Sequence, residues 1–140
     1  MSDGASAIMT PHDFPDLLVI EVEPPDEEAA SVTLASGAGT VVAFCYPCEL
    51  AVGSRVSNRL SVLDAEVQAA YLSDWPADER IAASKDRLER VGPYEYEGTG
   101  RVVDEELGLV LVQGFVIDFG AVLAGAGHVE FKIVRLDLAR

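Results

Sequence analysis

The chain has 140 residues, 49% of them hydrophobic, so it is long and apolar enough to form one folded domain with its own core. Its formal net charge of −14 repels nucleic acid and anionic lipid, and it attracts basic proteins and cations. No apolar run approaches the roughly 18 residues of a membrane-spanning helix, and the first residues do not have the pattern of a secretory signal, so we expect a cytoplasmic protein.

The acidic residues are concentrated near the start of the chain. The first 54 residues contain no lysine and no arginine, but they include nine acids: Asp3, Asp13, Asp16, Glu21, Glu23, Asp26, Glu27, Glu28 and Glu49. A surface with charge of one sign restricts the partners that can approach it, because it repels other acidic macromolecules.

Residues 1–15 are polar and contain two prolines, which predicts a flexible N-terminal arm before a single domain of residues 16–140. Leu17–Glu23 alternates with a period of two, as in a half-buried strand. We expect its apolar face to consist of Leu18, Ile20 and Val22.

Ser31–Ala35 and Thr40–Tyr46 are predicted to form a hairpin, because the glycines between them supply the positive φ of a tight turn. Arg55–Leu63 alternates as a further strand, in which Asn58 is the odd polar residue on the apolar face.

Residues 64–91 allow two interpretations. Asp64 could cap a short helix that ends at Tyr71, or the same residues could prolong the preceding strand. Ala77–Ser84 and Lys85–Val91 are predicted to be short helical pieces, which Gly92-Pro93 ends.

The last third of the chain is predicted to be β structure. Tyr94–Glu97 alternates, Arg101–Asp104 resumes the strand, and Leu109–Val112 and Phe115–Phe119 form a buried run that Gln113-Gly114 interrupts, as at a barrel corner. The apolar positions of His128–Leu138 change phase near Ile133–Val134, which predicts a bulge or a sharp coil there.

The fold class that follows is mainly β. Six to eight strands, with a short helical insertion around residues 64–91, predict a small, strongly coiled antiparallel barrel with an OB-like order of strands. Such an order is an analogy of topology, and it implies no function.

The most distinctive local motif is Cys45-Tyr46-Pro47-Cys48. A redox pair needs a helix after the first cysteine to lower its pKa, and the residues that follow are too few for one. A zinc site needs four ligands, and only His12 and His128 remain as partners for Cys45 and Cys48. Packing at the end of a strand is the favoured interpretation, with the two cysteines kept as weak metal candidates.

No catalytic constellation is present. A catalytic His128 would need a nucleophile and an orienting acid, and the chain has no nucleophile motif such as Gly-x-Ser-x-Gly. The paired carboxylates are typical of a solvated face. Neither glycine-rich stretch precedes a helix or carries the lysine of a phosphate loop. We therefore expect a protein that is not an enzyme and has no cofactor.

The expected function is binding of a basic protein partner, as in immunity proteins and inhibitors of bacterial toxins or nucleases, whose single-sign field speeds association. A homodimer is also compatible with the sequence. Trp75 is either a core residue or an exposed anchor for the partner. The predicted partner-binding residues are Asp26, Glu27, Glu28, Glu95, Glu97, Asp104, Glu105, Glu106 and Trp75.

The alternative function is an OB-like barrel that binds a small ligand or single-stranded nucleic acid. Aromatic side chains such as Tyr94, Tyr96 and Phe131 could stack on bases, and the basic clusters are Arg55/Arg59, Lys85/Arg87/Arg90 and Arg101. The net charge of −14 makes nucleic-acid binding the weaker possibility, and a positive groove would be needed for it.

Overall fold

The computed structural model describes residues 14–25, 27–123 and 125–138, so residues 1–13 of the predicted arm, with His12, lie outside the described residues. Its elements in chain order are β1 (Leu17–Glu23), β2 (Ala30–Ala35), β3 (Thr40–Cys45), β4 (Arg55–Val56), β5 (Leu60–Ala69), α1 (Ala77–Ala83), β6 (Arg87–Arg90), β7 (Tyr96–Asp104), β8 (Leu109–Val112), β9 (Phe115–Asp118) and β10 (His128–Leu138). With 51% of residues in strands and 6% in helix, the predicted mainly-β class is confirmed.

Five strands close into a barrel. Around it, β5 pairs with β9, β9 with β8, β8 with β7, β7 with β10, and β10 again with β5. The β5–β9 pair is parallel, so the barrel is mixed rather than purely antiparallel. Only β5 of the five barrel strands precedes α1 in the chain. The helix therefore comes after the first barrel strand, which is earlier than the expected OB-like order of strands has it.

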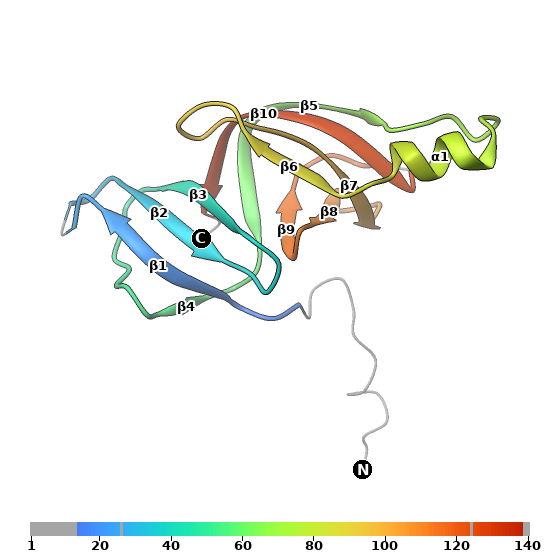
Figure 1. Ribbon diagram of the computed structural model, residues 1–140. Helices are drawn as coiled ribbons and strands as arrows, with labels where there is room; N and C mark the ends of the chain where they lie inside the picture. Colours follow the sequence, from blue (N-terminus) through green and yellow to red (C-terminus); the bar gives the residue numbers. More distant parts are fainter. Residues whose placement is uncertain (1–13, 26, 124, 139–140) are drawn as a thin grey trace, which may run out of the picture.

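Of the five other strands, β6 pairs with the edge of β7, and β4, β1, β2 and β3 form an N-terminal sheet. This sheet joins the barrel through one parallel pairing, Asp137 of β10 with Phe44 of β3 (Figure 1). Side chains from this sheet and from the barrel share one hydrophobic core. Leu17 and Leu34 of the sheet are fully buried in it, as are Phe115 and Leu136 of the barrel.

The long strands β5 and β10 lie side by side over most of their length and change their inward face at the same point (Figure 1). In β10, Val129, Phe131 and Ile133 are buried, and then Leu136 and Leu138. This confirms the predicted change of phase. The pairing with β5 keeps one register throughout, because β5 also changes phase at Asp64, which has φ of 64° and lies opposite Val134. Aspartate tolerates this left-handed conformation better than most residues.

Of the two interpretations of residues 64–71, the second is confirmed as far as Ala69, where β5 and its pairing with β10 end. The predicted helix at Lys85–Val91 is wrong, because Arg87–Arg90 forms β6 at the edge of β7. A Cβ atom at Gly98 of β7 would collide with the Arg87 carbonyl, so glycine there permits the close approach of β6.

Within the described residues α1 has no buried side chain and extends beyond the barrel (Figure 1). Its seven residues are too few to cross a membrane, and no other helix in the described ranges is long and apolar enough to do so.

The predicted inward face of β1 is also wrong. Leu17 and Val19 are buried, whereas Ile20 is 41% exposed. The pairing with β2 shifts by one residue between Val19 and Glu21, so Ile20 is the extra residue of a bulge and Val22 returns to the inner face.

At the β8–β9 junction, Gln113 and Gly114 both have positive φ and form a tight hairpin turn instead of the expected corner kink.

Asn58 interrupts the predicted strand Arg55–Leu63 and bridges to β9. Its Nδ2 donates to the Gly114 carbonyl at 2.8 Å, and its Oδ1 accepts from the Val116 amide at 3.0 Å. The side-chain amide of Asn58 thus bonds to β9 as a backbone peptide group of β5 would, and it continues the parallel β5–β9 pairing. This explains a polar residue at this position.

Replacing Asn58 with alanine removes both bonds and leaves two backbone groups of the barrel without partners. We expect Asn58→Ala to lower the free energy of unfolding by about 2 kcal/mol, at about 1 kcal/mol for each bond. Urea denaturation measures this loss, with Ser57→Ala at the adjacent exposed position as the control. Equal stability of the two variants would contradict the bridging role.

Tyr96 fills the gap where β3 separates from β10. Its hydroxyl accepts a hydrogen bond from the Val42 amide at 2.7 Å, and the residue is 3% exposed. We expect Tyr96→Phe to destabilise the protein by about 1–3 kcal/mol, because the Val42 amide loses its partner. Thermal or urea unfolding tests this, and Tyr46→Phe, at a position that is 58% exposed, should have almost no effect.

Candidate functional site

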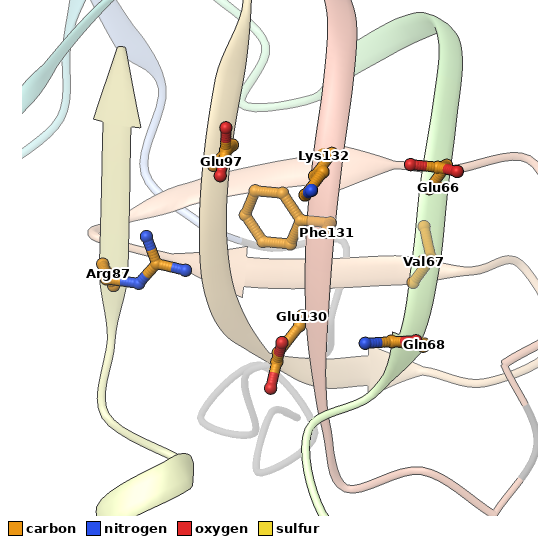
Figure 2. Close-up of a pocket in the computed structure, with 8 residues that line it drawn as sticks. All are labelled: Glu66, Val67, Gln68, Arg87, Glu97, Glu130, Phe131 and Lys132. Carbon is orange, nitrogen blue, oxygen red and sulfur yellow. The ribbon is translucent and has the colours of Figure 1, made fainter. Parts of the chain in front are cut away.

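The outer face of the barrel wall contains a cavity of about 310 Å³ over the neighbouring strands β5, β10, β7 and β6 (Figure 2). We call it the sheet-face cavity. Its lining residues come from all four strands: Glu66, Val67, Gln68, Arg87, Glu97, Glu130, Phe131 and Lys132.

Alternation along the strands places these polar side chains on one face. Lys132 of β10 lies opposite Glu66 of β5 on one side and Glu97 of β7 on the other. In the next row, Glu130 lies opposite Gln68 and Thr99, and Arg87 of β6 lies opposite Thr99 in turn. Directly opposed residues have Cβ atoms about 5 Å apart, so side chains of both charges meet over the cavity.

Most of these charges are unpaired. Arg87 Nη1 contacts Glu89 Oε1 at 3.1 Å, outside the cavity lining. Among the described residues, neither Lys132 nor the carboxylates of Glu66, Glu97 and Glu130 form an ion pair. The cavity therefore offers hydrogen-bond acceptors and donors whose charges the protein itself leaves unmatched.

A tyrosine–histidine pair lies beside the cavity, in the row beyond Glu130. The Tyr71 hydroxyl lies 3.2 Å from His128 Nδ1, and Arg101 is opposite His128 on β7. Burial lowers the pKa of His128 below its ordinary value of 6.5, and the Arg101 cation acts in the same direction, while Asp86 acts against both. The imidazole is therefore mostly neutral near pH 7, and its side-chain hydrogen-bond partner among the described residues is the Tyr71 hydroxyl.

The predicted acidic clusters lie in three places. Asp26 is outside the described residues, and its neighbours Glu27 and Glu28 are exposed in the β1–β2 connection. Glu95 is exposed in the β6–β7 turn. The third cluster is at the far end of β7, where Asp104 Oδ1 accepts from the Leu107 amide and Glu105 and Glu106 are exposed.

The β6–β7 turn, which carries Glu95, contacts the N-terminal sheet through Tyr94. The Tyr94 hydroxyl lies 2.6 Å from Ser31 Oγ, and its ring meets Phe44 edge-on with centroids 5.6 Å apart. Ser31 is opposite Glu23, and the outward Thr33 is opposite Glu21. We call the surface formed by Glu21, Glu23, Glu27, Glu28 and Glu95 the N-terminal acidic face.

Glu97 is the one predicted partner-binding residue that lines the sheet-face cavity. Arg87 was named only as part of a basic cluster for the alternative function, and sequence reasoning missed the other polar lining residues, Glu66, Gln68, Glu130 and Lys132. The sequence does show polar residues two apart, in Glu66/Gln68 and in Glu130/Lys132, which indicates one polar face on each strand. That these two faces lie side by side depends on the β5–β10 register.

Trp75 is 38% exposed and does not belong to the core of the described residues, so the interpretation as a core residue is wrong. It precedes α1, in a segment where Leu72 and Ile81 are also exposed.

The two cysteines lie in or against the hydrophobic core. Cys45 is fully buried in the core, and Cys48 is half-buried against it. Among the described residues, no group of three or more His, Cys, Asp or Glu side chains could hold a metal ion. The geometry supports packing as their role.

Comparison with family models, with curated proteins and with solved structures finds no match to this chain. Any statement about its function therefore depends on the surfaces described above.

His128 predicts a pH dependence of stability. The unfolded chain binds a proton at this residue at a higher pH than the folded chain, so its contribution to the free energy of unfolding is complete above 6.5 and decreases as the pH falls toward the lowered folded-state pKa. When the pH is lowered from about 7.5 to about 5.5, we expect the free energy of unfolding of the His128→Asn variant to fall less than that of the unsubstituted protein. Urea unfolding at the two pH values tests this, and equal losses would contradict it.

Proposed function

We propose that the protein is a non-enzymatic binding protein whose N-terminal acidic face docks onto a basic protein, as an inhibitor or immunity protein docks onto a toxin or nuclease. One observation supports this most directly. In the described part of residues 14–56, all six carboxylates are exposed and none forms an ion pair, and Arg55 is the single base: the acids are Asp16, Glu21, Glu23, Glu27, Glu28 and Glu49.

The centre of this surface is suited to a contact. Tyr94 and Phe44 are half-buried and rigidly packed, and the Arg135 guanidinium lies 4.4 Å from the Phe44 ring centroid. Asp137 holds Arg135 by a hydrogen bond of 2.7 Å from Nε. Binding energy in protein interfaces concentrates on such pre-ordered aromatic and arginine side chains, and a charged rim adds specificity.

The charge explains how such a protein would find its partner. A field of one sign raises the association rate with an oppositely charged protein, and salt reduces that gain. Proteins that act on nucleic acid carry the basic surface that this face would complement.

Binding of single-stranded nucleic acid has less support. The bases of β6 and β7 alternate with acids, since Arg87 pairs with Glu89 and shares the sheet-face cavity with three glutamates. A strand of phosphates would meet repulsion at each of these carboxylates.

The proposal predicts that Glu27→Gln/Glu28→Gln weakens partner binding more than Glu105→Gln/Glu106→Gln. Both double variants remove two exposed charges from a turn, so the net charge of the two proteins is equal. We expect the first variant to reduce the association rate at low salt several-fold, and the second to leave it within about twofold. The partner is first captured from a lysate of the source organism, and surface plasmon resonance then gives the rates.

Two results would contradict the proposal. One is that no basic protein is retained in stoichiometric amount. The other is that both double variants slow association equally, since general charge would then explain the binding without a specific face.

A further inference from the structure

The sheet-face cavity is separate from the N-terminal acidic face and has a different character. It lies over β5, β10, β7 and β6, and it combines three glutamates with Arg87, Lys132 and the Gln68 amide (Figure 2). Its volume of about 310 Å³ is at the lower end of the range for small-molecule sites, which suits a compact metabolite.

The lining excludes the simplest ligands. Glu66, Glu97 and Glu130 do not gather closely enough to hold a metal ion, within the residues that the structure describes. An inorganic anion would bring negative charge to three carboxylates that have no ion-pair partner. A fitting ligand therefore carries positive charge, and it must present its charges apart from one another.

We propose that the sheet-face cavity binds a basic α-amino acid, a small zwitterion with a carboxylate at one end and a guanidinium or ammonium group at the other. The ligand carboxylate contacts Arg87 in place of the exposed Glu89 carboxylate, which lies 3.1 Å from Arg87 Nη1; the guanidinium points from β6 toward β7 (Figure 2). The basic end contacts Glu130, in the row of side chains that also holds the Gln68 amide.

The spacing of the strands agrees with this orientation. β6 and β10 are two strands apart, which at about 4.8 Å for each step places Arg87 and Glu130 on backbones about 10 Å apart. Arg87 and Glu130 point toward β7 from its two sides (Figure 2), so one molecule that lies over β7 can contact both. Lys132 lies opposite both Glu66 and Glu97, so Glu130 is the lining glutamate that has no basic residue directly opposite it.

The test is an NMR titration of the full chain with arginine, agmatine and norleucine. Agmatine has no carboxylate, and norleucine has no basic group. We expect arginine to bind with a Kd about tenfold lower than that of agmatine or norleucine, because each of these two molecules lacks one of the charge-assisted hydrogen bonds that arginine makes. The amide signals that move should belong to β5, β6, β7 and β10.

Two variants assign the ends of the ligand. Arg87→Gln should remove the advantage of arginine over agmatine, because the ligand carboxylate loses its partner. Glu130→Gln should remove the advantage over norleucine. Arg55→Gln and Glu105→Gln are matched controls, since they make the same charge changes at exposed positions outside the cavity, and they should leave all three affinities unchanged.

Three outcomes would overturn the inference. Equal affinity for arginine and agmatine would show that the carboxylate is not recognised. Equal loss of binding in the control variants would show a general effect of charge. The absence of shifts at the cavity strands would show that the cavity takes none of these molecules. None of these results bears on the acidic docking face, whose residues all four variants leave intact.

Discussion

The fold depends on one bend that the paired strands β5 and β10 share. It lies at Asp64 of β5 and Val134 of β10, which are opposite each other. Two antiparallel strands that changed phase separately would lose their register, and one of them would turn apolar side chains to solvent. Because both strands change phase together, their pairing continues through the bend. The same two strands can then close the barrel with β7 and β9 and also carry the N-terminal sheet through β3.

The bend also separates the two candidate surfaces. Before it, β10 presents Glu130 and Lys132 outward over the sheet-face cavity. After it, the outward positions are Arg135 and Asp137, and their contacts are with Phe44 beside the N-terminal acidic face. A single strand therefore serves two surfaces with different chemistry, because its outward positions change from even to odd numbers within three residues.

Sequence reasoning predicts local order in this protein and fails where distant strands decide the outcome. The β2–β3 hairpin and the phase change in β10 follow from glycines and periodicity alone. β6 was missed because Arg87–Arg90 consists of good helix formers, and only the room at Gly98 makes pairing with β7 favourable. Of the cavity lining, Glu97 was predicted to bind a protein partner, and Arg87 and Phe131 were named only for the alternative function. Their meeting could not be predicted, because Glu66, Glu97 and Lys132 become neighbours through the registers of β10 with β5 and β7.

The distribution of charge implies that the two surfaces respond differently to salt. The carboxylates of the N-terminal acidic face are exposed and act on a partner over distances comparable to the Debye length, about 8 Å at physiological ionic strength. Their contribution is therefore mostly to the association rate and is screened readily. In the sheet-face cavity, Glu97 and Glu130 are partly buried, and opposite charges lie one strand apart. Interactions at that range are short and partly shielded from solvent, so they persist at salt concentrations that suppress long-range attraction.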